Sequence, residues 1–381
     1  MGFLDFFKQK ALNRTSTWKE LGTYNSIFSA FGGDIYRSDI VRSCIRPLAQ
    51  FTSKAEAQCS DDQMAKLINN RPNMYMSGKD FLQKVRTRYE LYNTCFIYIQ
   101  RGPNGKASGF YPVPYSTFEA LEYANGLFIR FHFDSGNSST LTLPWDDLAV
   151  VRKDYNKSDI AGDDNRAILQ TLELINTTNQ GVANAVKATA NLRGILKSTK
   201  AMLSPEDIKK NKETFVKDYL SLENEGGIAS LDSTQEFTPI SMSPTIANAA
   251  QLKEFREDVY RYFGVNDDIV MSNLDSSKIE AFYEMKIEPF LVALSTELTS
   301  KVFTQREIAF GAYIVFEANK LQFASLDKKI QIFSTVVLYG GMTVNEWRKA
   351  CNMAPIEGGD KLIRRLDADT VEEQEEVNED D

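Results

Sequence analysis

The chain has 381 residues, which is enough for two or three domains with a buried core. Its apolar and charged fractions are those of an ordinary folded protein, and no apolar run reaches the ~18 residues of a membrane span. The formal net charge is −8, but residues 371–381 hold seven acids and no base, so the remainder is almost neutral. We therefore expect a solvated, disordered acidic tail and no overall basic surface for tight nucleic-acid binding.

The four cysteines are scattered along the chain and form no CxxC pair; they are Cys44, Cys59, Cys95 and Cys351. This spacing argues against a disulfide framework and a zinc site, and fits a reducing cytosol. Residues 1–14 lack the basic region and cleavage site of a signal peptide. We expect them to form a short amphipathic helix that docks on a neighbour; a disordered end is the alternative.

The first 150 residues change from a helical to a strand-like pattern. Apolar residues at helical spacing predict helices at 40–51, 64–68 and 81–92. The period then becomes two, and turn residues such as Asn125-Gly126 separate the apolar runs. The predicted strands are 95–99, 110–114, 118–123, 127–133, 140–143 and 148–151. This region is therefore predicted to be an α+β domain with meandering antiparallel strands.

Two long helices are predicted to flank a small insert. One runs over 163–191 and carries small residues at Ala183, Ala185 and Ala188, which allow another helix to approach closely. The other begins at Ser243-Pro244 and ends at Gly264, a residue that tolerates the left-handed cap conformation. Between them, the pattern predicts strands at 194–197, 228–231 and 237–240 and a helix over 204–220.

A polar loop over 265–275 follows, and Ser276 or Ser277 is predicted to cap the next helix. Pro289 lies inside that helix and should kink it near Met285. Lys278 is the only base of the loop region and lies at a helix start, where the dipole disfavours a cation. Contact with an anionic group such as a phosphate would explain this position; a lysine pointing into solvent is the alternative.

The C-terminal third is predicted to return to strands and then to end in helices. Strands are expected at 308–315 and 321–323, and helices at 326–339 and 343–351. Thr343 and Glu346 have the spacing of a capping box at the start of the last helix.

The sequence offers little catalytic chemistry. His132 is the only histidine, which excludes multi-histidine metal sites. The run Gly102 to Lys106 is too short for a phosphate-binding loop and is interpreted as a hairpin turn. We expect no cofactor, no metal and no enzymatic activity.

In its whole order, the chain resembles the tailed-bacteriophage portal protein family. The residues that carry the resemblance are Cys44-Ile45-Arg46-Pro47-Leu48-Ala49, Asn70-Arg71-Pro72-Asn73, 91–99, Tyr111-Pro112-Val113-Pro114, Phe263-Gly264-Val265, Ser272-Asn273, 341–348, Asn352, Pro355 and Gly358-Gly359-Asp360. The resemblance implies an α+β portal-type fold, with an α+β wing, two long stem helices, a small strand-helix-strand clip, a kinked helix and a helical crown. It assigns 1–160 to the wing, 161–191 to the first stem helix, 192–242 to the clip, 243–263 to the second stem helix, 264–278 to the tunnel loop, 279–302 to the kinked helix, 303–325 to returning wing strands, 326–366 to the crown and 367–381 to the tail.

The resemblance also implies a function and its residues. It implies a ring, usually of twelve copies, at one capsid vertex of the virion, assembled in the host bacterial cytoplasm. The ring would conduct double-stranded DNA and bind the terminase large subunit, the head-tail connector and the major capsid protein, with no membrane partner. The tunnel loop would face DNA through Asp267, Asp268, Met271, Ser272, Asn273, Asp275, Ser276 and Lys278. The stem interface would use Ala183, Ala185 and Ala188, and the clip would contact the motor or adaptor through Lys197, Lys200, Glu206 and Lys209.

Two other functions remain open from the sequence. A monomeric or small-oligomer head-tail adaptor or scaffold would form no DNA channel. A nucleic-acid enzyme would require a catalytic constellation that the sequence does not display.

Overall fold

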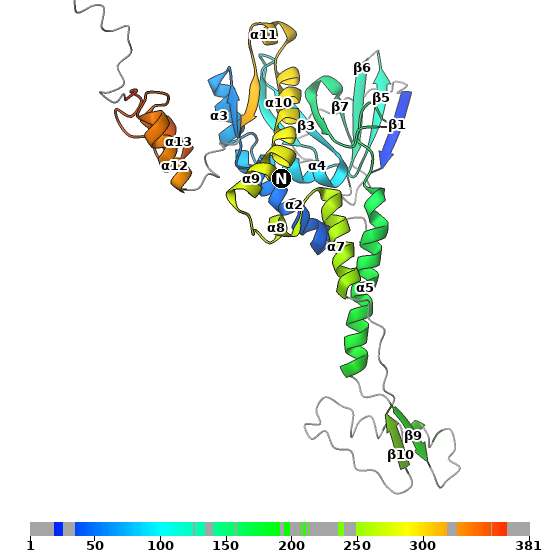
Figure 1. The fold of residues 1–381 in the computed structure, drawn as a ribbon. Coiled ribbons are helices and arrows are strands. Elements are labelled where there is room, and N and C mark those ends of the chain that lie inside the picture. The colour runs from blue at the N-terminus through cyan, green and yellow to red at the C-terminus, as the bar shows by residue number, and fades with distance from the viewer. Residues whose placement is uncertain are drawn as a thin grey trace, which may run out of the picture. The chain divides into compact units, whose positions relative to one another are not determined.

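The computed structural model describes residues 19–25, 35–124, 126–133, 140–156, 158–190, 194–198, 235–239, 249–317, 326–351 and 353–363, with single residues at 206, 209, 210 and 213. The chain divides into two compact units (Figure 1). Ile168–Val259 forms one unit, and Met1–Ala167 with Tyr260–Asp381 forms the other. The predicted strands at 228–231 and 321–323, the helix start at Ser243-Pro244 and the acidic tail lie outside the described residues.

Three helices near the N-terminal end of the larger unit contain the predicted ranges. They are α2 (Asp39–Thr52), α3 (Asp62–Asn70) and α4 (Gly78–Tyr92), and a 3-10 turn, η3 (Ile35–Arg37), precedes them. Asp61 caps α3 by accepting from the backbone of Gln63, and Ser77 forms a capping box with Asp80 at the start of α4. The apolar faces of α2 and α4 pack on each other.

Two antiparallel sheets follow. The first has the order β4-β3-β8, from β3 (Thr94–Arg101), β4 (Ala107–Pro112) and β8 (Leu148–Arg152), and η4 (Trp145–Asp147) leads into β8. The second has the order β1-β5-β6-β7, from β1 (Lys19–Asn25), β5 (Thr117–Tyr123), β6 (Gly126–His132) and β7 (Thr140–Pro144). Tyr123 pairs with Gly126 across the predicted hairpin turn, and Ala124 has a φ of 49° there. The core of both sheets is rich in aromatic residues, among them Phe96, Tyr115, Phe118 and Phe131.

A long helix from the C-terminal half of the chain packs on two of the strands. It is α10 (Glu288–Val302), which packs on β8 and on β11 (Ile314–Glu317), and β11 pairs with β2 (Glu56–Cys59). Glu297 Oε1 accepts from Val150 N at 3.0 Å, and Ser295 Oγ accepts from Phe316 N at 2.9 Å. These bonds hold α10 against β8, which lies 147 residues away in the sequence, and against β11, which follows α10 and α11 directly.

The strand predicted at 308–315 is wrong in its first part. Residues 305–309 form α11 (Gln305–Ala309), and only 314–317 are a strand. Thr304 and Glu307 form a capping box that starts this helix, and Gly311, with a φ of 90°, follows its end. The Thr-x-x-Glu spacing was the available signal, and it decides the local structure against the apolar run.

The last described helices are α12 (Leu326–Ile332), which continues into the π-helical η7 (Phe333–Val337), and α13 (Val344–Ala350). Thr343 caps α13 as predicted: its Oγ1 accepts from Glu346 N at 3.2 Å, and Glu346 Oε2 accepts from Thr343 N at 2.8 Å. Asn345 then holds the following loop, because its side chain bonds to both Ile356 N and Asp360.

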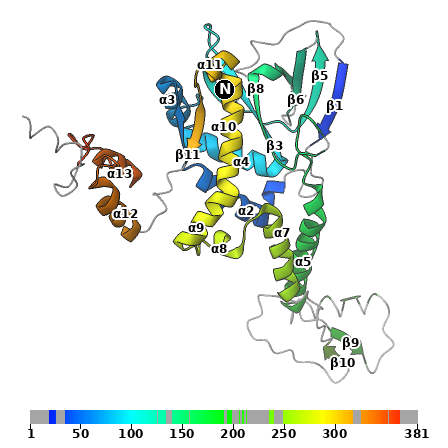
Figure 2. The same cartoon turned by 45° about the horizontal axis from the view of Figure 1, so that its top comes forward.

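In the smaller unit, α5 (Arg166–Ala190) and α7 (Ala249–Phe263) run side by side in both views (Figure 1, Figure 2). Leu172 and Ile175 of α5 are buried. The strands β9 (Gly194–Ser198) and β10 (Gln235–Pro239) lie at two of the places predicted for the insert, and they pair antiparallel.

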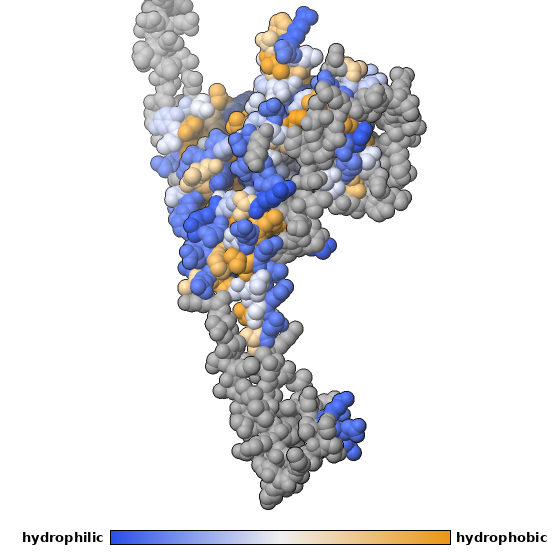
Figure 3. Space-filling model, turned by 90° about the vertical axis from the view of Figure 1, so that its right-hand side faces the viewer, coloured by the Kyte–Doolittle hydropathy of each residue, from blue (hydrophilic) through white to orange (hydrophobic). Residues whose placement is uncertain are grey.

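The surface of the described residues is predominantly polar. On the face in Figure 3, hydrophilic residues predominate and apolar ones lie in small separate patches, a distribution that is normal for protein surfaces. Among the described residues, no helix is both long and apolar enough to cross a membrane.

Candidate functional site

The segment between α7 and the helix after it has a fixed beginning. Gly264 has a φ of 68°, and its N–H donates to Arg261 O at 3.1 Å, while Val265 N donates to Tyr260 O at 2.9 Å. These two bonds form a Schellman motif, which uses the orphan carbonyls of the last helical turn. Val265 is buried directly after the glycine. The predicted helix end at Gly264 therefore agrees with the structure, and the chain leaves α7 in one defined direction.

From the sequence, residues 265–275 are expected to be a loop throughout, and the structure differs. Residues 267–270 form the short helix α8 (Asp267–Val270), capped by Asn266, whose Oδ1 accepts from Ile269 N at 3.0 Å. Ile269 is buried, and α8 lies against α2. A single buried apolar side chain thus gives order to a stretch that reads as polar. Tertiary packing, which is invisible to local periodicity, explains the difference.

The cap of the next helix also differs from the prediction. It is Asp275, not Ser276 or Ser277, that caps α9 (Ser276–Phe282): Asp275 Oδ1 accepts from Lys278 N at 2.8 Å and from Ser277 Oγ at 3.0 Å. The hydrogen bond from Lys278 N is the largest cause that lowers the pKa of Asp275. Aspartate is as good an N-cap as serine, and here the carboxylate of Asp275 is the group that reaches the backbone of α9.

Lys278 pairs with a carboxylate of the same segment. Its Nζ lies 2.7 Å from Asp268 Oδ2, and this hydrogen bond raises the pKa of Lys278. The pair with Asp268 accounts for a cation at the start of a helix: the Lys278 side chain is exposed, as one reading expected, and it is engaged within the chain. Contact of Lys278 with a DNA phosphate stays a prediction. Any phosphate would have to compete with Asp268 for the ammonium.

The remaining residues of the segment form an exposed polar ridge. The exposed members are Asn266, Asp267, Met271, Ser272, Asn273, Asp275, Ser277 and Lys278, and Met271 is 73% exposed. Ser276 is the first residue of α9, and its side chain is outside the described set. With Lys278 held by Asp268, the ridge presents carboxylates and neutral polar groups, which would interact weakly or repulsively with a polyanion.

The helix beyond the segment changes its pitch at the predicted place. Between α9 and α10 lies a π-helical turn, η5 (Tyr283–Ile287), and Pro289 is in the first turn of α10. Proline has no N–H and its ring crowds the carbonyl four residues before it, which is that of Met285. The wider π turn accommodates this conflict.

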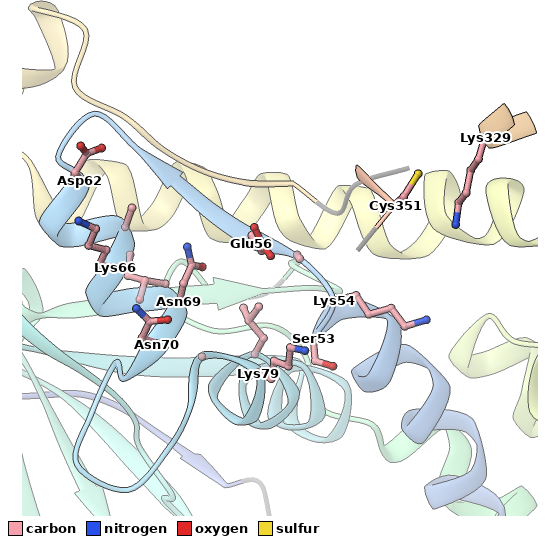
Figure 4. Close-up of a pocket in the computed structure, with 15 residues that line it drawn as sticks. Ser53, Lys54, Glu56, Asp62, Lys66, Asn69, Asn70, Lys79, Lys329 and Cys351 are labelled. Carbon is pink, nitrogen blue, oxygen red and sulfur yellow. The ribbon is translucent and has the colours of Figure 1, made fainter. Parts of the chain in front are cut away.

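A cleft of about 970 Å³ lies elsewhere in the larger unit, at the end of α2 and the start of α4 (Figure 4). Its lining holds four lysines, two carboxylates and a cysteine: Lys54, Lys66, Lys79, Lys329, Glu56, Asp62 and Cys351. Burial lowers the pKa of Lys54, whose ammonium lies 4.6 Å from the centre of the Phe51 ring. Such a lining suits an anionic group but does not supply a nucleophile with a histidine base.

The only histidine is in a structural setting. His132 Nε2 lies 3.1 Å from Glu119, which also pairs with Arg130 on the neighbouring strand. Within the described part of the chain, no three histidines, cysteines or carboxylates are grouped as metal ligands.

The predicted stem and clip residues are only partly visible. Ala183 is exposed, Ala185 is buried within its own chain, and the side chain of Ala188 is outside the described set. Lys197 lies on β9, and Lys200 falls outside the described residues. Glu206 and Lys209 are helical and exposed.

Sequence reasoning missed a buried charge cluster close to both ends of the loop. It consists of Arg86, Glu90 and Lys153, and the Arg86–Glu90 pair is almost fully buried. A weak signal was present, since Arg86 and Glu90 are four residues apart on a helix with an apolar face. Nothing near Lys153 in the sequence indicated that it would join them.

Known proteins share both the sequence pattern and the fold of this chain. The model of the family described as phage portal protein matches residues 39–352. The probable portal proteins of Lactococcus phage p2 and Lactococcus phage SK1 are each 24% identical over 189 residues, which cover 47% of this chain and 50% of theirs. The alignment thus spans about half the length of these curated relatives.

Two solved structures resemble this one in fold. The neck of an empty gene transfer agent particle computed with C6 symmetry has a TM-score of 0.60 at 13% identity, covering 86% of this chain and 92% of its own. The neck of the native particle computed with C12 symmetry has a TM-score of 0.59 at 14% identity, covering 84% and 92%. Since the family model matches most of the chain, including α7, α9, α10 and the ridge between them, this chain belongs to the phage portal protein family.

Proposed function

We propose that this chain assembles into a closed ring, of twelve copies, that forms the channel for double-stranded DNA at one capsid vertex. The observation that carries the proposal is the family match over residues 39–352, which contains the exposed acidic ridge between α7 and α9. The likeness in fold to neck structures computed with C6 and C12 symmetry supports a ring. The role is structural and not enzymatic.

In this proposal, residues 264–278 line the channel. A channel wall that lets DNA slide should bind few phosphates, because each neutralised phosphate adds affinity. The ridge meets this requirement: Asp267 and Asp275 are exposed, and the only lysine is paired with Asp268 at 2.7 Å. The exposed polar residues would contact DNA through water or through weak hydrogen bonds.

The other parts of the chain receive roles by analogy with the family. Residues 192–242 would bind the terminase large subunit and later the head-tail connector, with Lys197, Lys200, Glu206 and Lys209 as contacts. The major capsid protein would surround the larger unit in the virion. Ala183 is the best candidate for the contact between stem helices of neighbouring copies, because Ala185 is already buried within its own chain.

The ring itself is tested by mass photometry and negative-stain imaging of the purified protein. We expect closed rings with a mass of about twelve chains. Ala183→Leu should weaken assembly by overpacking the contact, whereas Ala183→Ser, at nearly the same volume, should not. A monomer or small oligomer at all concentrations would contradict the ring and favour the adaptor alternative.

The channel wall is tested by reversing its charge. Asp267→Lys with Asn273→Lys would add positive charge to the ridge without removing the Asp275 cap. DNA packaging should then slow or stall, most strongly at low salt, while rings still assemble. The matched control is Gln63→Lys with Asp146→Lys, which makes the same charge change at other exposed positions. Normal packaging by the ridge variant across salt concentrations would show that the ridge does not contact DNA.

A further inference from the structure

Both ends of the ridge segment converge on the buried cluster of Arg86, Glu90 and Lys153. We infer that this cluster is a positioning centre that holds the end of α7 and the π turn η5 in one arrangement, and so sets where residues 265–278 lie. The inference rests on the proposed function only in taking this segment as the wall of the DNA channel. The contacts themselves are independent of any ring.

The cluster is compact and shielded from water. Arg86 Nη2 lies 2.7 Å from Glu90 Oε1, and Lys153 Nζ donates to the other carboxylate oxygen. The side chains of Arg86, Glu90 and Lys153 are 3%, 4% and 19% exposed. Burial alone would raise the pKa of Glu90, but the charges of Arg86 and Lys153 outweigh it and lower that pKa. The carboxylate therefore stays ionised, and the two cations remain fixed around it.

The first end of the segment reaches the cluster through Asn165. Its Nδ2 donates to Glu90 O at 3.1 Å and to Leu91 O at 2.8 Å, so it is bound to the last turn of α4. Its Oδ1 accepts from Tyr262 OH at 2.7 Å, in the last turn of α7. Lys153 Nζ also lies 5.9 Å from the centre of the Phe263 ring. The final turn of α7, directly before Gly264, is thereby attached to the backbone of the helix α4 that carries Arg86 and Glu90, and it lies near the ammonium of Lys153.

The second end reaches the cluster through Arg86. Its Nη1 donates to Lys286 O at 3.0 Å, a carbonyl of the π turn. Its guanidinium lies 4.6 Å from the centre of the Phe290 ring, which packs edge-on against Tyr89 at 4.8 Å. A guanidinium can serve Glu90 and the carbonyl at once because its donors form a rigid planar fork.

The two ends also meet each other. The Lys286 side chain lies over Gly264, so that a Cβ at position 264 would collide with its Nζ and Cε. Glycine here satisfies two demands, the positive φ of 68° and the close approach of Lys286. The ends of the segment are therefore held together at one centre, although they are about 20 residues apart.

Such a cluster is better suited to fixing geometry than to adding stability. Replacing a buried ion pair by well-packed apolar residues is often neutral or stabilising, because the charges no longer need to leave water. A buried charge with directional bonds to two separate backbone elements, however, permits only one arrangement of them. We therefore expect variants that keep the fold but lose the position of the segment.

The key variant is Arg86→Lys. It keeps a positive charge next to Glu90 but loses the fork that also reaches Lys286 O. The matched control is Arg88→Lys on the same helix, because Arg88 donates to Tyr115 O and stacks on Tyr92 and Tyr115, away from the segment. A triple variant, Arg86→Met, Glu90→Met and Lys153→Met, removes all three charges at similar volume.

The readout is amide hydrogen exchange of the purified protein without DNA, compared between residues 266–291 and the β5–β6 hairpin. In Arg86→Lys we expect at least about tenfold faster exchange in 266–291, the scale of one lost charge-assisted hydrogen bond, with the hairpin unchanged. Arg88→Lys should leave 266–291 unchanged. The triple variant should give the Arg86→Lys pattern even if its melting temperature equals that of the wild type.

Equal exchange in 266–291 for Arg86→Lys and Arg88→Lys would overturn the inference. So would a change spread evenly over both regions, since this indicates only a general loss of stability. Because the measurement needs neither DNA nor a ring, its result is separate from that of the charge-reversal test: a local change in exchange without any role of the ridge in packaging would refute the proposed function and retain the positioning centre.

Discussion

Two sets of opposite charges lie close to the same segment but in different surroundings. Asp268 and Lys278 pair at 2.7 Å with side chains that are 36% and 47% exposed. Arg86 and Glu90 pair at the same distance with side chains that are 3% and 4% exposed. The interatomic distance is identical, so any difference in their effects must come from burial and from the other bonds that each group makes.

The comparison shows that the distance between the charged atoms does not by itself determine how much an ion pair contributes to stability. Water screens the exposed pair, and its long side chains lose conformational freedom when they meet, so such pairs contribute little. In the buried cluster, each charge depends on its partners, because removal of one leaves another without water or counter-charge. The exposed pair can adjust the charge of the surface, whereas the buried cluster can hold backbone elements in place.

The largest effect should come from breaking the buried cluster on one side. Glu90→Gln leaves two buried cations without their carboxylate, and we expect a loss of about 3–5 kcal/mol in the free energy of unfolding. Urea denaturation, followed by a spectroscopic signal from the larger unit, measures this loss. The matched control is Glu280→Gln on an exposed position of α9, which should change stability by less than about 0.5 kcal/mol. If Glu90→Gln and Glu280→Gln changed the free energy of unfolding equally, the proposed difference between buried and exposed charges would be wrong.

The same cluster predicts a dependence on acid pH. The folded-state pKa of Glu90 is lowered below its unfolded value. Its contribution to stability is therefore fully present above the unfolded pKa and is lost as the pH falls through the folded pKa. Wild type should lose more stability than Glu90→Gln between about pH 5 and pH 2. Parallel pH profiles of the two proteins would mean that Glu90 does not titrate in this way.

An exposed capping box should have an intermediate effect. Thr343 and Glu346 hold the first turn of α13 by two reciprocal hydrogen bonds, of 3.2 Å and 2.8 Å. Thr343→Ala removes one bond partner and should cost about 1 kcal/mol, while Thr343→Ser keeps the hydroxyl and should cost less. The melting temperatures of wild type, Thr343→Ser and Thr343→Ala measure these differences in stability. A large packaging defect with unchanged melting would indicate that Thr343 makes a direct functional contact.

The smallest effect on stability should come from the exposed pair. Asp268→Asn should lower the melting temperature by less than about 2 °C at low salt and by less still near 1 M salt. Lys278→Gln should behave alike, and the double variant should add nothing further if the two groups interact only with each other. An effect as large as that of Glu90→Gln, or one that is insensitive to salt, would contradict the assignment of this pair as screened.

Alkaline pH sharpens the test of the exposed pair. Asp268 raises the pKa of Lys278. The contribution of the pair is therefore fully present below the unfolded pKa of lysine and is lost as the pH rises through the folded pKa. At neutral pH, Lys278→Gln should lower the melting temperature of the wild type, but it should have no effect in a protein that already carries Asp268→Asn.

Features that depend on neighbouring residues could be predicted from the sequence. The end of α7 at Gly264, the hairpin before Gly126 and the capping box at Thr343 each follow from one residue's conformational preference or one short-range hydrogen bond. Pro289 also predicts a disturbance of the helix near Met285, and the structure has an irregularity there; that it takes the form of a π turn was not predicted. The helix α11 could have been found in the same way, from Thr304 and Glu307, but the apolar run over 308–315 took precedence.

Features that join distant parts of the chain were decided only by the tertiary structure. Lys153 meets Glu90 across 63 residues, and Arg86 meets Lys286 O across 200. No local pattern specifies such partners, since their meeting depends on how α4, the end of β8 and the π turn are packed. The short helix α8 has the same origin, because the burial of Ile269 within the larger unit, where α8 lies against α2, outweighs the polar composition around it.

The sequence by itself determined the end of α7, the hairpin at Gly126 and the start of α13, because glycine, turn residues and caps act over one helical turn or less. It also determined the family, because the order of these local features is specific. The tertiary structure alone decided which charges are buried, that Lys278 is held by Asp268, and that Tyr262 and Lys286, near the two ends of residues 264–278, are both linked to α4. Burial changes the energy of a charge far more than its sequence neighbours do, and burial exists only once the elements have packed.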